Sequence, residues 1–498
     1  MGYTFTCFLS WLCRITLILA SFCISDAGHA QSLPVPQDTY RIQFVTNDEV
    51  RVSAQILVRT GVLTMDGGSK PDVRSANVAD LQASSNEGKP ITASYDSQRG
   101  SWTLATLGAQ RINLSYAVHL NSLRALPAWA RLQYGFFDGD AVYLVMRGLI
   151  VAPDSTDSTD AVSVSFSLPS GSKIAAPWPY DKEKQTYTST IAALVNNAIV
   201  AGRFSQVFYR EGNFAITAAL LGEWPLHQSA VERVIRASVA RDLQLFPGTP
   251  ADQYLVILAS GDEDGQSYTT SNAVSTRLAI GKDDTEIWAN TIAHELFHHW
   301  NARLIHTTDK RLAFFVEGFT EYYANRQILA ESLVDQPRYW NMAALHLGAY
   351  SYFNYSPNYG VSIADAGLNK TKNRFGVYDG GWTLALCLDL SLRAESQNRH
   401  SLDDVMKLMW LRYGQTRQTY AYKDFVQVVS DVAGHDMNSF FDRYVSGTDE
   451  LPFKSDLARI GVAAYDQPFG GEAYIKVTPS DGEKRLFYDD FMAINAAH

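Results

Sequence analysis

Apolar and polar residues alternate with a period of two along the first third of the chain. Alternation of this kind places one face of each segment in a core and is typical of β-strands. Clusters rich in Gly, Asp and Ser separate the segments and predict turns. The pattern therefore predicts an antiparallel β-domain. Its clearest strands are expected at 40–46, 51–60, 111–120, 141–151 and 162–169.

After about residue 190 the apolar positions recur three and four residues apart. This is the spacing of a helix that buries one face. One continuous apolar segment, at 252–260, predicts a strand within this region, and Ser401 with Asp404 predicts a capping box at the start of one helix. The predicted helices cover 229–246, 284–304, 313–333, 401–414 and 436–447.

These patterns predict a multidomain α+β protein in four parts. Residues 1–30 form a leader, 31–185 the N-terminal antiparallel β-domain, 186–455 a mostly helical domain and 456–498 a short C-terminal tail. Of the 498 residues 46% are hydrophobic and 19% charged, which is enough apolar material for more than one core. The net charge of −10, without any Lys/Arg-rich run, argues against a nucleic-acid partner.

The first 30 residues have the composition of a secretory signal peptide. Arg14 is the only charge before an apolar run at 15–24. The residues on either side of His29 are small, as signal peptidase requires at the positions that it recognises. We predict cleavage after Ala30, export to the periplasm or the extracellular medium, and no stable membrane association afterwards. An uncleaved anchor is the alternative, although the run is short for a membrane span. Cys387 is then the one cysteine of the mature chain, and its apolar neighbours predict a buried, inert thiol.

The strongest chemical signal is the heptapeptide His-Glu-Leu-Phe-His-His-Trp at 294–300, inside a predicted helix. Residues four apart lie on one face of a helix, so His294 and His298 can direct ring nitrogens at one metal ion. Glu295 lies one step round the helix, where it can reach a metal-activated water without being a ligand. Three polar residues on an ordinary helix are the chemically silent alternative. For His299, which has no place in the motif, a solvated or supporting role is predicted.

A third ligand distinguishes these alternatives. One zinc-peptidase arrangement needs glycine and histidine at 301 and 304, where this chain has Asn301 and Leu304. The other takes a glutamate from the next helix and leaves the fourth position open. Glu317 stands on that helix. Glu321, one turn further, is placed to accept a hydrogen bond from a ligand histidine, with a solvated carboxylate as an equal alternative.

Two stretches, "HELFHHWN" at 294–301 and "FFVEGFTEYYA" at 314–324, together resemble the glycyl aminopeptidase family of gluzincin metallopeptidases. Further similar stretches extend the resemblance over most of residues 160–455. They lie at 167–179, 193–204, 376–396 and 440–453.

This resemblance implies a thermolysin-like zincin catalytic domain with one Zn²⁺ per chain, held by His294, His298 and Glu317. It implies hydrolysis of peptide bonds by a zinc-activated water, with Glu295 as general base. Tyr378, in "VYDGGW", matches the tyrosine with which the family donates a hydrogen bond to the transition state. A peptide or protein is the implied substrate.

The sequence departs from this family in two places. Members often carry a PDZ-like domain after the catalytic domain, and the residues after 455 are too few for one. Members also have a Gly-Gly-Leu-Glu-His stretch before the zinc helix, whose glutamate holds the α-amine of the substrate. Here Ser267 and Tyr268 stand at the Glu and His positions and offer only neutral hydroxyls, so we expect weak selection for a free amine. Asp262, Glu263 and Asp264 are an alternative source of a carboxylate, although a solvated acidic turn explains them as simply.

Two functions therefore remain. The first is an exported zinc metallopeptidase, aminopeptidase-like by its resemblance, and both endo- and exopeptidase action are open. The second is a non-catalytic zincin-fold protein that binds peptides. The presence of Glu295, Glu317 and Tyr378 together favours the enzyme.

Overall fold

The computed structural model describes residues 38–46, 48–65, 74–106, 108–154, 160–250, 253–261, 264–276, 285–465, 474–477 and 483–492. The predicted leader at 1–30 lies outside the described residues. No helix in the described ranges has both the length and the apolar composition needed to cross a membrane.

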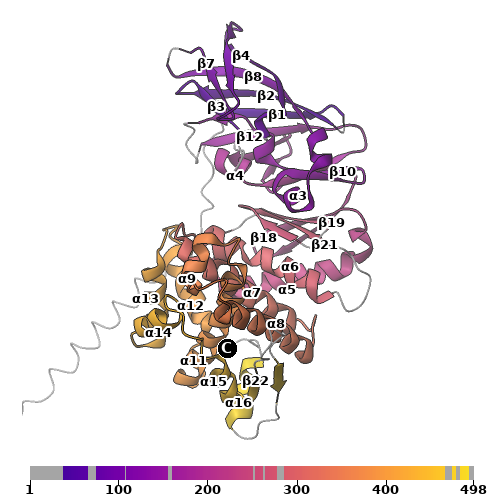
Figure 1. The fold of residues 1–498 in the computed structure, drawn as a ribbon. Coiled ribbons are helices and arrows are strands. Elements are labelled where there is room, and N and C mark those ends of the chain that lie inside the picture. Colours follow the sequence, from indigo (N-terminus) through magenta and orange to yellow (C-terminus); the bar gives the residue numbers. More distant parts are fainter. Residues whose placement is uncertain are drawn as a thin grey trace, which may run out of the picture. The chain divides into compact units, whose positions relative to one another are not determined.

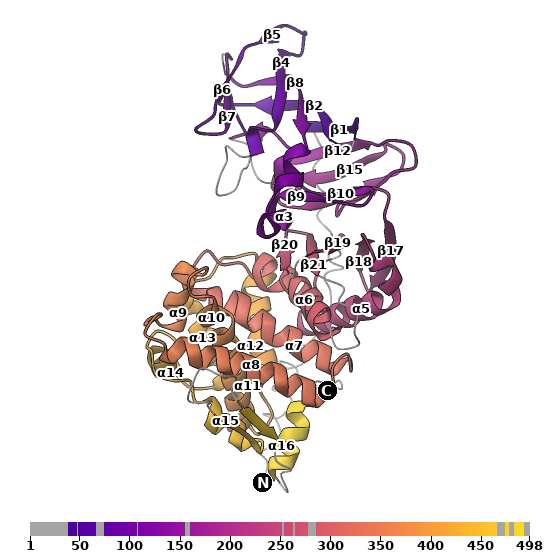
Figure 2. The ribbon, with the colours of Figure 1, turned by 45° about the vertical axis from the view of Figure 1, so that its right-hand side comes forward.

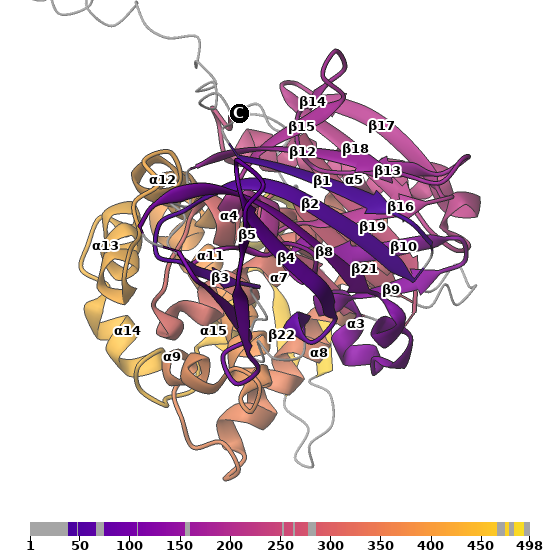
Figure 3. The ribbon, with the colours of Figure 1, turned by 90° about the horizontal axis from the view of Figure 1, so that it is seen from above.

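The N-terminal part is built on an eight-stranded sheet with the order β14-β15-β12-β1-β2-β8-β4-β5 (Figures 1 and 3). Every second residue of β2 is buried, which is the predicted alternation. All neighbouring pairs are antiparallel except β1 and β12, which run parallel. The strands are β1 (Asp38–Phe44), β2 (Glu49–Val58), β4 (Val78–Ser85), β5 (Pro90–Ile91), β8 (Gln110–His119), β12 (Ala161–Ser167), β14 (Tyr180–Asp181) and β15 (Thr186–Thr190).

Two four-stranded sheets complete this part, with the orders β11-β3-β7-β6 and β13-β16-β10-β9. β15 and β16 lie after residue 185, so strand pairing in the N-terminal part continues beyond the boundary predicted there, as far as Gly202. The core of β16 is a short, fully buried apolar run, a pattern that strands and buried helices share. The elements are β3 (Val62–Thr64), β6 (Ala93–Asp96), β7 (Ser101–Leu104), β9 (Gly135–Asp138), β10 (Ala141–Val145), β11 (Ala152–Pro153), β13 (Lys173–Ala175) and β16 (Ala198–Gly202), with the short helices α3 (Ala128–Tyr134) and α4 (Ile191–Val195).

The second part begins with a five-stranded sheet of order β17-β18-β19-β21-β20. Only β19, a continuous apolar run, was predicted; β20 and β21, which are rich in Gly, Ser, Thr and Asn, were among those missed. β20 is the edge strand and runs antiparallel to β21. The strands are β17 (Ser205–Glu211), β18 (Phe214–Leu220), β19 (Gln253–Ser260), β20 (Asp264–Ser267) and β21 (Ser271–Thr276).

Helix α5 lies between β18 and β19 in the chain, and the other helices of this part follow β21 (Figure 2). The side chains buried among them form an apolar, aromatic-rich core. The five predicted helices are present, but α6 ends at 297 instead of 304, and α7 begins at 320 instead of 313, after a π-helical turn at Phe315–Phe319 that carries Glu317. Ser401 and Asp404 form the expected capping box. α8 and α13 were not predicted. The helices are α5 (Gln228–Leu245), α6 (Thr285–Phe297), α7 (Thr320–Ala330), α8 (Gln336–Tyr355), α9 (Ile363–Ala366), α10 (Arg374–Val377), α11 (Asp379–Ser396), α12 (Leu402–Met409), α13 (Tyr422–Ala433) and α14 (Asn438–Tyr444). Cys387 is fully buried within α11, as expected.

The described residues after 455 are packed rather than extended as a tail. They form the end of α15 (Phe453–Arg459), then β22 (Val462–Tyr465), β23 (Tyr474–Val477) and α16 (Glu483–Met492). Leu457 and Phe491 are fully buried in the core of the helical part, and Trp340 Nε1 donates to the Tyr488 hydroxyl at 3.2 Å. This segment is therefore part of the same core as α7, α8 and α11.

Candidate metal centre

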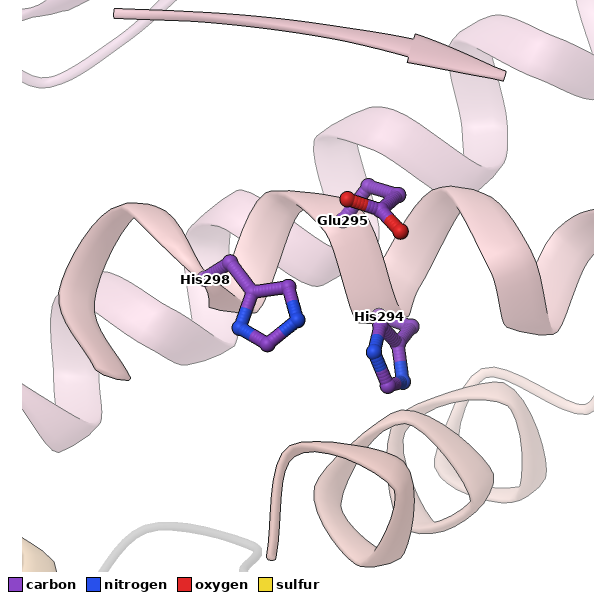
Figure 4. A group of neighbouring side chains, drawn as sticks. All are labelled: His294, Glu295 and His298. Carbon is purple, nitrogen blue, oxygen red and sulfur yellow. The ribbon is translucent and has the colours of Figure 1, made fainter. Parts of the chain in front are cut away.

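Helix α6 carries His294 and Glu295, and His298 is the first residue after its end. The apolar side chains of α6 are buried in the core and hold the helix in place: Ala289, Ile292, Ala293, Leu296 and Phe297. His294, Glu295 and His298 are buried with them, each 7% exposed. Figure 4 shows both imidazole rings on one side of the helix and the Glu295 carboxyl group on another. This is the arrangement expected for two ligands with a base beside them.

The helix ends sooner than predicted. Sequence periodicity indicated a helix as far as residue 304, but α6 ends at Phe297, and a π-helical turn with irregular backbone at Asn301 and Ala302 follows. The buried Asn301 amide donates to the carbonyl of Phe315 at 2.9 Å and to the Thr320 hydroxyl at 3.1 Å. These bonds connect the end of the zinc-motif helix to the segment that carries Glu317.

Glu317 lies opposite the two histidines. Its Oε2 atom is 3.6 Å from His294 Nε2 and 3.4 Å from His298 Nε2. In a tetrahedral zinc site with bonds of about 2.0–2.1 Å, ligand atoms lie about 3.3 Å apart. The spacing and chemistry of these three atoms thus fit one zinc-sized ion. Close backbone contact positions the segment, because a Cβ atom added at Gly318 would come within 2.4 Å of Gly381 Cα in α11.

Glu295 is the competing third ligand. Atoms of His294, Glu295 and His298 also come within 4.8 Å of one another and could hold a metal. Glu317 is the better ligand, because one of its oxygens is close to both ring nitrogens, whereas Glu295 points to a different side of the helix. Glu295 Oε2 has no hydrogen-bond partner among the described residues, and burial raises the pKa of this carboxyl group against the opposing charges of the two histidines.

The outer nitrogens of both histidines are held by oxygen acceptors. His294 Nδ1 lies 2.7 Å from Glu321 Oε2, and His298 Nδ1 lies 3.1 Å from the Asn301 carbonyl. With Nδ1 donating, each Nε2 is left with a lone pair for a metal, which is the usual way that a ligand histidine is oriented. Glu321 is thus placed beside His294, where the sequence spacing put it, and is not a solvated carboxylate.

A buried polar network around Glu321 was not predicted. Glu321 Oε1 accepts from Asn290 Nδ2 at 2.8 Å and from Asn325 Nδ2 at 3.3 Å. His346 Nε2 lies 3.6 Å from the same oxygen, and its Nδ1 is 2.8 Å from Asp379 Oδ1. His346 belongs to the unpredicted helix α8 and has no sequence motif, so no local signal marked it.

The carboxylates of this network control the charge of its histidines. Burial alone would lower the pKa of His294, but the hydrogen bonds of Glu317 and Glu321 outweigh it and raise the pKa to about 10. Asp379 and Glu321 likewise raise the pKa of His346 to about 9 against the effect of burial. The site is therefore a compact, charge-balanced cluster in which a dication can replace a proton on His294.

Tyr378 lies at the start of α11, with its ring stacked beside that of His294 at a centroid distance of 6.3 Å. Burial, reinforced by the negative charge of Glu317, raises the pKa of its phenol far above the ordinary value. The hydroxyl therefore stays protonated and can donate a hydrogen bond. Lys370, also not predicted, has its Nζ atom 2.5 Å from Glu317 Oε1.

The edge strand β20 packs directly against Glu295. A Cβ atom added at Gly265 would lie 2.3 Å from Glu295 Oε1, so only glycine permits this approach. Ser267 and Tyr268, expected to offer neutral hydroxyls at the site, do not. Ser267 is buried, and the Tyr268 hydroxyl bonds to the Leu132 carbonyl at 2.5 Å and to the Tyr143 hydroxyl at 2.8 Å. Ser267, the last residue of β20, and Tyr268, which follows the strand, are both buried, so neither offers its hydroxyl at the site.

Of the three acidic residues considered as substitutes, Asp262 and Glu263 lie outside the described residues, and Asp264 is exposed at the start of β20. His299 is neither solvated nor a support for a ligand. It is buried against Phe214, Tyr254 and Trp300, and burial lowers its pKa to about 3.

Comparisons with known proteins agree with this architecture. Residues 71–203 match the Peptidase M61 N-terminal domain. The fold is similar to that of an aminopeptidase N family protein from Idiomarina loihiensis, with a TM-score of 0.72 and 18% sequence identity over 86% of this chain and 79% of the other. It is also similar to an M1 zinc metallopeptidase from Deinococcus radiodurans, crystallised as a mutant with a Tyr-Ser-Ala substrate, with a TM-score of 0.52 and 13% identity over 85% and 96% of the two chains. No curated protein matches the sequence. At these identities the two structures establish the fold, and they confirm the predicted order of an N-terminal β-sheet part followed by a helical part.

Proposed function

We propose that this protein is an exported zinc metallopeptidase that hydrolyses peptide bonds. The observation that carries the proposal is the convergence of His294, His298 and Glu317 on one point, with the buried carboxyl group of Glu295 beside them. The match of residues 71–203 to the N-terminal domain of a peptidase family supports it, as does the likeness in fold to two proteins described as aminopeptidase-like or as a zinc metallopeptidase.

Nε2 of His294, Nε2 of His298 and Oε2 of Glu317 would hold one Zn²⁺. When bound, zinc supplies a Lewis acid that lowers the pKa of a water molecule and polarises a carbonyl group. Glu321 and Lys370 hold the ligand set in position, through Nδ1 of His294 and Oε1 of Glu317. The protein residues alone account for the remaining steps.

Glu295 acts as the general base. Its buried Oε2 atom, without a partner among the described residues, is available to accept a proton from the attacking water and to deliver it to the leaving amine. Burial raises the pKa of this carboxyl group and so makes it a better proton acceptor, which suits a base that later returns the proton to the leaving amine. Tyr378 donates its phenolic proton in a hydrogen bond to the oxyanion of the transition state.

The substrate lies extended along β20. The strand ends the sheet of the catalytic part, and an edge strand can bind a peptide through its free N–H and C=O groups. Gly265 lets the backbone come close to Glu295, which brings a peptide on this edge next to the base. Because Ser267 and Tyr268 face inward, the family's amine-holding glutamate has no counterpart at those positions, and we propose an aminopeptidase-like enzyme with weak amine selection.

The test measures both the zinc content of the purified protein and its cleavage of a mixed peptide library. The purified protein should hold about one zinc per chain, and His298→Ala or Glu317→Ala should lose most of it, because three ligands set the affinity. Glu295→Gln should keep the zinc and lose cleavage. A wild-type protein without zinc would overturn the proposal. Zinc and peptide binding without any cleavage would instead establish the alternative, a non-catalytic peptide-binding protein.

Export is proposed from the leader sequence. Expression of the full chain in a bacterial host, followed by N-terminal sequencing, should give a mature protein that begins at Gln31 and is recovered outside the cytoplasm. A chain that retains residues 1–30 in the membrane fraction would show that the leader is an anchor.

A further inference from the structure

Two cations flank the ring of Tyr378, and they differ in their partners. Lys370 Nζ lies 5.0 Å from the ring centroid and is already paired with Glu317 Oε1. Arg374 Cζ lies 4.9 Å from the same centroid. Arg374 is exposed, and within the described part of the chain its guanidinium group makes no ion pair with a carboxylate.

The position of Arg374 follows from the local fold. It is the first residue of the short helix α10, and Tyr378 follows one helical turn later, so the tyrosine ring leans back toward the guanidinium group. α10 packs closely against α8 and α9, since any side chain at Gly376 would collide with Phe353 and Ala366. The arginine is thus held beside the residue that faces the reacting carbonyl.

The charge of Arg374 also reaches the substrate strand. Loss of hydration raises the pKa of Asp264, the first residue of β20, and the positive charge of Arg374 acts against that rise. The residue after Asp264 is Gly265, which abuts Glu295. A cation near both Tyr378 and the start of β20 repels a substrate ammonium group and attracts a carboxylate.

We propose that Arg374 binds a carboxylate of the peptide substrate close to the scissile bond. The carboxylate is either the side chain of an acidic residue or the free C-terminus of a short peptide. The planar guanidinium group suits it, since it can donate two parallel hydrogen bonds to a carboxylate. This inference rests on the proposed peptidase function and specifies its substrate class.

The test uses pairs of peptides that differ only in one carboxylate. One set replaces Glu by Gln at each position flanking the scissile bond, and the other replaces a free C-terminus by its amide. The wild-type enzyme should show a kcat/KM about tenfold higher for the charged member of one pair, the usual size of a charge-assisted contact. The pair that shows this preference identifies whether the carboxylate is a side chain or the C-terminus.

Variants then assign the preference to one residue. Arg374→Gln should bring the ratio of kcat/KM between the charged and the neutral peptide to about one, and Arg374→Lys should retain part of the preference. Arg374→Glu should favour a Lys-containing peptide over its Glu twin. Lys372→Gln removes an equal charge from the same exposed segment and should leave the ratio as in wild type. A purely structural role for Arg374 would lower all rates together and leave the ratio unchanged, which would overturn the proposal, as would equal rates for every pair in an active wild-type enzyme.

A separate readout distinguishes failure of this inference from failure of the proposed function. Absence of cleavage of every peptide, including neutral ones, is failure of the peptidase function. In that case calorimetric binding of the same pairs to wild type and to Arg374→Gln still decides the inference. About tenfold tighter binding of the carboxylate peptide to wild type only would support it, and equal binding to both proteins would overturn it.

Discussion

The two parts of this chain build their cores differently. The core of the N-terminal sheets is apolar, and the tyrosines that enter it donate their hydroxyls to backbone carbonyls, as Tyr40 does to Val151 and Tyr116 to Leu149. The helical part buries ionisable side chains together with its aromatic residues. Among them are His294, Glu295, His298, Arg326 and Asp389.

Buried polar groups cost free energy unless they are hydrogen-bonded, and buried charges cost more. Most of those in the helical part are paired: Asp389, for example, accepts from the Tyr322 hydroxyl at 2.7 Å and from Arg393 Nε at 2.9 Å. The exception that matters is Glu295 Oε2. The N-terminal core is thus held mainly by apolar packing, whereas the helical core also holds in place the groups to which we assign the chemistry.

The largest expected effect separates chemistry from stability at Glu295. Glu295→Gln should reduce kcat by about 10²–10⁴-fold, because an amide cannot accept a proton from the attacking water. Thermal unfolding should stay the same or improve, since a buried carboxylate without a partner is removed. Initial-rate kinetics and calorimetry measure the two quantities, and wild-type activity in this variant would mean that another residue is the base.

The opposite result is expected in the core of the N-terminal sheets. Ile112 is fully buried and faces Ile56 across β2 and β8. Ile112→Ala should lower the free energy of unfolding by about 2–5 kcal/mol through the cavity that it leaves. The kcat of the protein that remains folded should be unchanged, as measured by denaturant titration and active-site-normalised rates. A large fall in kcat would show that this core also controls the site.

An intermediate effect is expected at Tyr378. Tyr378→Phe should lower kcat by about a hundredfold with little change in KM, if the hydroxyl serves only the transition state. Zinc content and far-UV circular dichroism should match those of wild type. A rise in KM at constant kcat would instead assign Tyr378 to substrate binding.

A smaller effect is expected from the network behind the metal ligands. His346→Gln should weaken zinc binding by about tenfold, because Glu321 then holds His294 less firmly. Leu345→Gln, at the exposed neighbouring position on α8, is the matched control and should bind zinc as wild type does. Competition with a chelator measures the zinc affinity of each variant. An affinity of His346→Gln equal to that of wild type would show that His346 does not support zinc binding.

The smallest effect concerns the substrate amine. A short peptide with a free N-terminus and its N-acetylated twin should differ in kcat/KM by less than about a hundredfold, because the hydroxyls of Ser267 and Tyr268 face inward. A larger preference for the free amine would show that an anion, for example Asp264, anchors it.

Local spacing in the sequence predicted which of the proposed site residues share a helix face, whereas the approach of Glu317 to the two histidines depends on how two segments pack. His294 and His298 are four residues apart, and Glu317 and Glu321 are also four apart, so helix geometry alone places each pair on one face. The same reasoning predicted the alternating strands, because one buried face imposes a period of two on any sheet. Both signals depend only on residues close together in the chain.

Tertiary packing decided the rest. β21 is a strand because it pairs with β19, and β20 because it pairs with β21, and their polar sequences do not indicate either pairing. The inward direction of Tyr268, the contact of Gly265 with Glu295, and the placement of His346, Lys370 and Arg374 depend on which segments pack together. A side chain's role at this site is set by neighbours that are distant in sequence, and no local period records those neighbours.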